Sequence, residues 1–277
     1  MKKHIKTIIC VLLVLVVGGA AGFFGGNLIV GKYFQHNVYA NLTEEELVDD
    51  VNLINYKSKT PDQLSGTEVF VVGQHLFNTS NFSENYSSGT METSIGITQL
   101  TTQYTCKNGD VYHNETLTYG SFLSNATMFD YTIGGNVFNY VGEAKSNKLE
   151  DVVWDKNSTE MTLEEFEAES HSQIESNWAY IISSKTVLSA SQCTIDGELY
   201  SYTLELDPVK APLHYAKQIS YFMATTSMPT FVSISYSFTV DKNFNLVETH
   251  RTEHFKLNYA GVLVDVYGTI NNILVTR

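Results

Sequence analysis

Positive charge, cysteine and proline are all scarce in this chain. Its 277 residues include 4 Pro, 3 Cys and 17 Lys and Arg. Without Lys2, Lys3 and Lys6, which precede every acidic residue, 14 basic residues remain against 30 Asp and Glu, a formal charge of −16. Nucleic acid and anionic lipid surfaces are bound through clustered Lys and Arg, so this composition argues against both as partners.

Cysteine scarcity limits the cross-links that the chain can form. Cys10 lies in an N-terminal apolar segment, and only Cys106 and Cys193 follow that segment. Export of the rest of the chain, argued below, would permit a disulfide between Cys106 and Cys193. Spacing alone cannot show that their Cα atoms come within bridging distance. The alternative is two buried thiols in unrelated strands.

The sequence also lacks the short signatures of common catalytic sites, because it has no G-x-S-x-G, S-x-x-K or C-x-x-C motif. One match, His250-Arg251-Thr252-Glu253-His254, has the H-x-x-E-H order of a zinc-peptidase helix. The surrounding alternation instead predicts a strand, where residues four apart are separated by about 13 Å. Imidazoles at that separation cannot share a Zn²⁺ ion at about 2.1 Å. We predict no metal site, no cofactor and no enzymatic activity.

What the chain does have is one long uncharged run, from Thr7 to Gly31, preceded by three lysines and closed by Lys32. At a rise of about 1.5 Å per residue, a helix over residues 8–31 is long enough to cross a hydrocarbon core about 30 Å thick. The excess of lysine before the run places the N-terminus in the cytoplasm. We expect residues 1–32 to form a transmembrane anchor or signal segment, with everything after it outside the cell membrane.

Two alternatives remain open within this segment. Cleavage as a signal peptide, after Ala21 or after Ala40, would leave the remainder secreted instead of anchored. Gly18, Gly22 and Gly26 recur every four residues, a spacing that lets two helices approach closely in lipid and form a dimer. A glycine-rich signal region produces the same spacing without dimerisation.

The remainder divides into a stalk and a folded domain. Residues 33–60 have little apolar periodicity and an acidic patch, and predict a solvated juxtamembrane stalk. Helices are predicted from Thr60-Pro61 to about Phe77, from Thr162 to about Glu175, and from Pro212 to Met223. We expect residues 61–277 to form one extracytoplasmic domain.

Strand signals dominate that domain. Asn108-Gly109, Gly134-Gly135 and Asp196-Gly197 separate β-rich runs and predict three hairpins. Residues 231–240 alternate apolar and hydroxyl side chains, which predicts a strand with one buried face and one wet face. The fold class is therefore α+β and mostly β: one curved antiparallel sheet of about eight or nine strands with three helices.

Two segments carry a resemblance to a known family. The order of elements in the domain resembles the half-barrel of lipoprotein carriers of the LolA/LppX type. The residues that carry the resemblance are the hairpin Thr105-Cys106-Lys107-Asn108-Gly109-Asp110-Val111-Tyr112 and the closing run from Phe238 to Val247. The resemblance implies a concave sheet face, closed by helices, that holds an acyl chain or another apolar ligand. The residues that would line it are Tyr200, Tyr202, Ile234, Tyr236 and Phe238. The alternative is that these residues pack under a helix as core. The chain lacks the lipobox of a lipid-attached carrier.

These observations give three hypotheses in order. The first is a membrane-anchored, non-enzymatic cell-surface protein of a bacterium whose β-rich half-barrel binds an apolar or envelope-derived ligand such as a lipid. The second is a structural or adhesion module with a solid core and no ligand. An exported hydrolase with a site of dispersed residues is the third. An enclosed apolar cavity of about 300 Å³ or more would favour the first.

Overall fold

Long strands dominate the first half of the domain. The structure is a computed structural model that describes residues 42–120, 124–170, 174, 178–222, 228–259 and 262–277. A meander of five strands comes first and two short strands follow: β1 (Phe82–Thr93), β2 (Thr98–Asn108), β3 (Val111–Gly120), β4 (Ser124–Thr132), β5 (Val137–Glu143), β6 (Val153–Trp154) and β7 (Thr159–Met161).

The second half contributes six more strands, namely β8 (Val187–Ala190), β9 (Thr194–Asp196), β10 (Leu199–Leu206), β11 (Thr230–Asp241), β12 (Leu246–Tyr259) and β13 (Val262–Thr276). The described strands form one 13-stranded sheet in the order β6-β5-β4-β3-β2-β1-β13-β12-β11-β10-β8, with β7 beside β5 and β9 beside β10. β13 joins the two halves, because it pairs with β1 from Ser83↔Thr276 to Thr93↔Val266.

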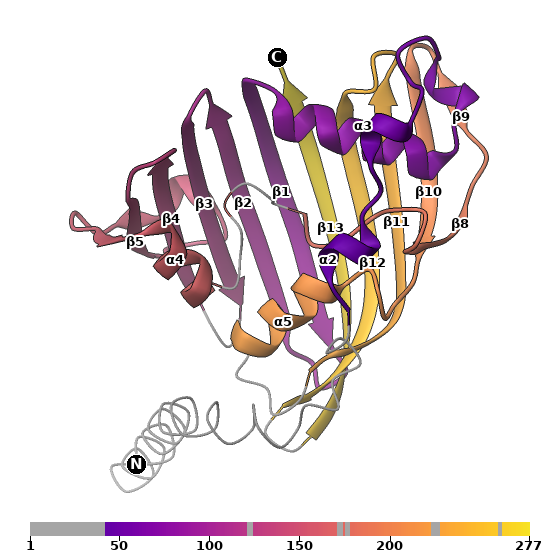
Figure 1. Cartoon of the computed structure of the whole chain (residues 1–277). Helices are drawn as coiled ribbons and strands as arrows, with labels where there is room; N and C mark the ends of the chain where they lie inside the picture. The colour runs from indigo at the N-terminus through magenta and orange to yellow at the C-terminus, as the bar shows by residue number, and fades with distance from the viewer. Residues whose placement is uncertain (1–41, 121–123, 171–173, 175–177, 223–227, 260–261) are drawn as a thin grey trace, which may run out of the picture.

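All four α-helices among the described residues lie on the concave face of this sheet (Figure 1): α2 (Glu44–Leu47), α3 (Gly66–Thr79), α4 (Leu163–Ser170) and α5 (Leu213–Phe222). Three single turns of 3₁₀ helix accompany them: η1 (Val51–Leu53), η2 (Pro61–Gln63) and η3 (Leu149–Asp151). α3 begins at a capping box, in which Ser65 and Glu68 satisfy each other's backbone N–H groups. Its buried side chains, including Val69, Phe70 and Phe77, face the sheet.

The apolar residues form two cores of unequal size. The larger lies under α3 and α5, over β10–β13, and includes Phe70, Phe238 and Phe255. The smaller lies under α4 and consists of Tyr131, Val137, Phe166 and Ile174, with half-buried neighbours. The convex face is wet. Hydroxyl pairs cross it between β10 and β11, where Ser201–Thr239 and Thr203–Ser237 are each 2.9 Å apart.

The mostly-β, antiparallel fold class is confirmed, but the number of strands was underestimated. The main omission is β1, which begins at Phe82 within the Asn/Ser-rich residues 78–89, where no strand was predicted. This strand lacks apolar alternation, and its backbone is instead paired on both sides, with β2 and with β13. All three glycine hairpins are present, and Gly109, Gly134 and Gly197 have φ of 58°, 79° and 61°.

Part of the predicted stalk, the described residues 42–60, packs on the domain, and residues 33–41 lie outside the described residues. Leu47 of α2 is 4% exposed, and Ser183 donates a hydrogen bond to the Leu47 carbonyl. The Asp49 carboxylate accepts from the backbone N–H of Ser184 at 2.6 Å. Thr60-Pro61 opens only the 3₁₀ turn η2, and α3 begins at Gly66.

The membrane segment 8–31, the cleavage positions Ala21 and Ala40, and the glycines Gly18, Gly22 and Gly26 lie outside the described residues. Among the helices that are described, none has the length and apolar character needed to cross a bilayer.

Candidate functional site

The residues predicted to line a ligand cavity are core instead. Tyr202, Ile234, Tyr236 and Phe238 are 3%, 1%, 4% and 2% exposed, and Tyr200 is half-buried beside them. They lie under α3, as the alternative prediction held. The ring of Phe70 on this helix packs edge-on against Tyr236 and Phe238, with centroids 5.3 and 5.2 Å apart.

Further contacts fill the space in this half of the sheet. Tyr202 stacks on Phe238 with centroids 5.4 Å apart, and its hydroxyl donates to the Pro61 carbonyl at 2.7 Å. A Cβ on Gly66 would come 2.9 Å from the Tyr202 ring, so the helix backbone lies directly on this side chain. Burial raises the pKa of Tyr236 to about 12. The half-barrel is therefore closed by packing over β10–β12.

Cys106 and Cys193 are both free thiols, so the disulfide that export would permit is not formed. Cys106 lies on β2, and Cys193 lies just before β9, next to β10. Four strands separate β2 from β10 in the sheet, which at about 4.8 Å per strand spacing puts the strands about 24 Å apart. A disulfide requires Cα atoms within about 7 Å.

The H-x-x-E-H residues lie in β12, as predicted, and their side chains alternate between the two faces. The two histidines point to the convex face, where His250 bonds Asn271 at 2.6 Å and His254 bonds Asp265 at 2.8 Å. Arg251 and Glu253 point into the core. The Glu253 side chain is fully buried, and its carboxylate accepts hydrogen bonds from the hydroxyls of Tyr180 and Tyr215.

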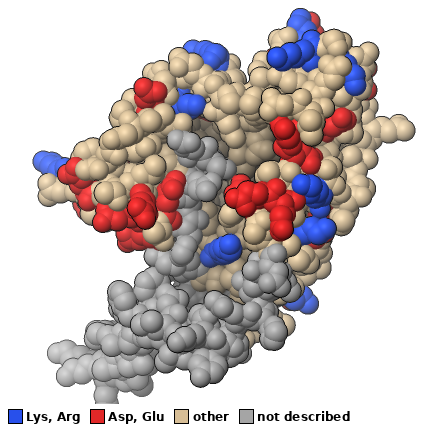
Figure 2. Space-filling view, viewed as in Figure 1, with Lys and Arg blue, Asp and Glu red and all other residues tan. Residues whose placement is uncertain are grey.

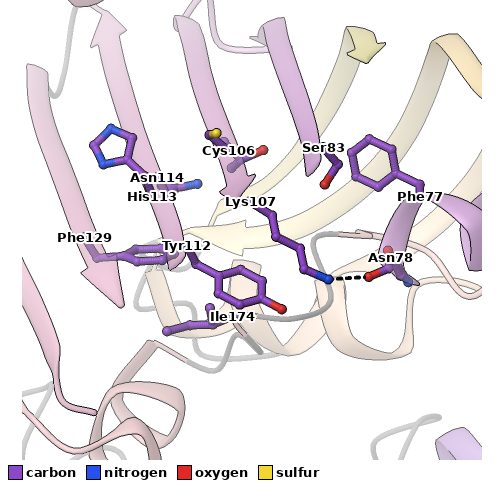
Figure 3. Close-up of a pocket in the computed structure, with 11 residues that line it drawn as sticks. Phe77, Asn78, Ser83, Cys106, Lys107, Tyr112, His113, Asn114, Phe129 and Ile174 are labelled. Carbon is purple, nitrogen blue, oxygen red and sulfur yellow. Dashed lines mark hydrogen bonds between the residues drawn. The ribbon is translucent and has the colours of Figure 1, made fainter. Parts of the chain in front are cut away.

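The opposite end of the concave face, over β1–β4, carries a small pocket between the C-terminal end of α3 and Ile174 (Figure 3). Its apolar walls come from the rings of Phe77, Tyr112 and Phe129 and from Ile174. The enclosed volume is about 30 Å³. A water molecule needs about 10–15 Å³ of such space, so the pocket has room for about two.

The floor of this pocket is polar and comes from three adjacent strands. Ser83, Thr105 and Asn114 lie on β1, β2 and β3 and are 5%, 7% and 5% exposed. Strand pairing produces this floor, because Thr105 pairs with Asn114 and Lys107 with Ser83, and alternate residues share a face. None of these three residues was predicted as a site residue from the sequence. The available signal was the alternation around Gly109, within the same hairpin that carries the family resemblance.

Lys107 is the cation of the pocket. Its ammonium donates to the Asn78 carbonyl at 2.8 Å and lies 5.7 Å from the centroid of the Tyr112 ring (Figure 3). None of the described residues that line the pocket is Asp or Glu. A lysine whose charge meets no lining carboxylate is unusual in so acidic a chain, and it can attract an anionic or carbonyl oxygen.

The neighbours of these strand residues point to the convex face and form a separate polar row. Cys106 pairs with His113, whose Nδ1 is 2.7 Å from Asp130 and whose Nε2 is 3.4 Å from Glu115. Both ring nitrogens therefore face carboxylates, so His113 is not turned toward the thiol as a general base would be. This arrangement does not favour the hydrolase hypothesis.

A second, larger cavity of about 400 Å³ lies outside α3. Residues 51–57 form nearly all of it, and His75 is the only lining residue from the helix. Asn52, Asn55 and Lys57 make it largely polar. It is a bend in one chain segment and does not open onto the sheet, so the pocket over β1–β4 is the better candidate.

Comparison with known proteins gives a likeness of fold only. No protein-family model and no curated protein matches the sequence. The structure is similar to the crystal structure of a LolA superfamily protein from Nitrosomonas europaea, with 9% identity and a TM-score of 0.26, covering 77% of this chain and 94% of that chain. It is also similar to the crystal structure of a Bacteroides fragilis protein described provisionally as an outer membrane protein, with 11% identity and a TM-score of 0.11. This match covers 73% of this chain and 98% of that chain.

Proposed function

We propose that this chain is a non-enzymatic, membrane-anchored cell-surface protein whose concave sheet face over β1–β4 binds an amphipathic, envelope-derived ligand. One observation carries the proposal: the two halves of the concave sheet face differ in how they are covered. Over β10–β12 the face is sealed by α3, whereas over β1–β4 buried polar side chains and aromatic rings converge on a pocket. Apolar walls with a few placed polar groups are typical of ligand sites, but a volume of about 30 Å³ is below the 300 Å³ expected of a cavity that encloses a whole ligand, so this pocket would hold only one end of it.

The position of the described chain supports a site close to a membrane. If residues 8–31 are retained as an anchor, only residues 32–41 connect them to Leu42, where the described domain begins. Ten residues reach at most about 36 Å when fully extended. The binding face would then be held next to the bilayer surface, where envelope lipids are available.

Native mass spectrometry of the full chain, purified from its own membranes, tests this function. We expect a co-purifying lipid-like mass that is reduced in Phe129→Ala, which removes a wall of the pocket. The matched control is Met128→Ala, because Met128 is the preceding residue of β4 and points to the convex face. A bare polypeptide mass for the wild type, or equal loss in both variants, would contradict the proposal.

The filled core over β10–β12 favours the second candidate, a structural or adhesion module without a ligand. The two candidates differ in what the pocket does. If the protein is a structural module, a Phe129→Ala variant that retains the wild-type melting temperature should also retain the module's adhesion and binding partners, because the pocket would have no part in them.

A further inference from the structure

The pocket over β1–β4 contains hydrogen-bonding groups that the described chain does not use. The side-chain hydroxyls of Ser83 and Thr105 bond to no described residue, although both residues are more than nine-tenths buried. Asn114 is equally buried and uses its Oδ1 to accept from Thr116 at 3.0 Å, which leaves its NH₂ group to donate. These donors and acceptors face the pocket and are available to pair with a ligand that enters it.

The chemistry of these groups favours an acceptor that carries negative charge. Lys107 has three N–H donors, and the Asn78 carbonyl takes one of them. The Asn114 NH₂ and the two hydroxyls add further donors on the same face of the sheet. Lys107 is the only Lys, Arg, Asp or Glu among the described lining residues, and the nearby Glu167 carboxylate is occupied by the backbone N–H of Ile174 at 3.2 Å.

Size and surroundings narrow the class of anion. A volume of about 30 Å³ has room for about two water-sized oxygens, which is the number in a carboxylate. Acidic side chains gather over α2 and over α4 in the view of Figure 2, on either side of this region, and disfavour a group with two negative charges. Phe77, Phe129 and Ile174 offer apolar surface beside the floor.

We propose that this pocket binds the carboxylate end of an amphipathic carboxylic acid, with Lys107 and Asn114 as the selective residues and the apolar chain lying along Phe77 and Phe129. The inference rests on the proposed function and adds the class of head group to it. A neutral or cationic head group on the same chain would leave Lys107 without a counter-charge.

Trp178 provides a reporter, because its indole N–H donates to the Asn78 side chain at 3.0 Å and its ring lies 5.7 Å from that of Phe77. The chain has 2 Trp, so the Trp154→Phe background isolates this signal. The full chain in this background, in lipid nanodiscs, is titrated with brominated octanoate, octanol and octyltrimethylammonium of matched chain length. We expect quenching of Trp178 at the lowest concentration with the carboxylate.

Substitutions then assign the selectivity. Lys107→Met is expected to weaken carboxylate binding about tenfold, the effect of losing a charge-assisted hydrogen bond, and to leave alcohol binding unchanged. Lys107→Arg keeps the charge and should keep most of the affinity, and Lys145→Met, at an exposed loop lysine, is the control. Equal quenching by carboxylate and alcohol, or tighter binding of the ammonium compound, would overturn this inference while leaving the proposed function intact. Quenching by none of the three would overturn both.

Discussion

Replacing Glu253 with glutamine should destabilise the domain strongly, because this residue is the centre of a buried polar cluster. Its carboxylate accepts from the hydroxyls of Tyr180 and Tyr215 and faces the Arg251 Nε at 3.4 Å. The guanidinium also lies over both tyrosine rings, 5.2 and 4.9 Å from their centroids. Tyr180 belongs to the segment after Trp178 and Tyr215 to α5, so one carboxylate connects two covering segments to the sheet.

The magnitude follows from the charge that the substitution leaves behind. The Arg251 Nε is buried and makes no hydrogen bond, so its contact with Glu253 is purely coulombic. Removing one partner of a buried ion pair typically costs about 3–5 kcal/mol. For a domain of this size, about 2–4 °C of melting temperature is lost per kcal/mol, so the expected decrease is about 6–20 °C.

Urea unfolding followed by circular dichroism measures the change in the free energy of unfolding. The control is Glu92→Gln at an exposed residue of β1, and its free energy of unfolding should stay within about 0.5 kcal/mol of the wild-type value. The double variant Arg251→Met/Glu253→Gln removes both charges and should recover part of the loss, with a coupling energy of about 1–3 kcal/mol. If Glu253→Gln unfolds like wild type, or if the double variant loses the sum of the two single losses, the buried pair does not stabilise the fold as reasoned.

Three further predictions concern the core and the thiols. Burial raises the pKa of the hydroxyls of Tyr180, Tyr215 and Tyr236. The unfolded chain therefore releases these protons at lower pH than the folded chain, and stability that is present below about pH 10 should fall as the pH rises above it. Urea unfolding midpoints that stay constant across this pH range would contradict the prediction. Phe70→Ala should cost about 3–5 kcal/mol because Phe70 is fully buried, whereas Leu53→Ala, at a residue 84% exposed, should change the urea midpoint little. In a Cys10→Ser chain unfolded without reductant, a thiol reagent should label both Cys106 and Cys193; labelling that depends on a reductant would reveal a disulfide.

Local chemistry predicted the hairpins and two of the helices well. The glycines at 109, 134 and 197 require positive φ, and each joins two strands as expected. The Thr162 and Glu165 capping box opens α4 with reciprocal bonds of 2.8 and 3.2 Å. Both the hairpin turns and the start of the helix depend on residues close in sequence, so the local sequence is enough to predict them.

Features that depend on distant partners were not predictable in the same way. β1 is a strand because of its neighbours β2 and β13, and its own residues give no apolar alternation. Val232 was expected to face inward with Ile234, but the register shifts between Phe231 and Ser233, and Val232 is 47% exposed. The pocket floor joins Ser83, Thr105 and Asn114 from three strands, and only the pairing register brings them together.

The two ends of the strand order limit how this molecule can polymerise. β8, at one edge, has 4 residues, and at the other edge β5 is covered by β6 and β7, of 2 and 3 residues. A new strand added at an edge is held by a row of free backbone N–H and C=O groups, and such short edges provide few of them. Even at high local concentration, copies of this protein should therefore remain separate molecules and not extend one another's sheets.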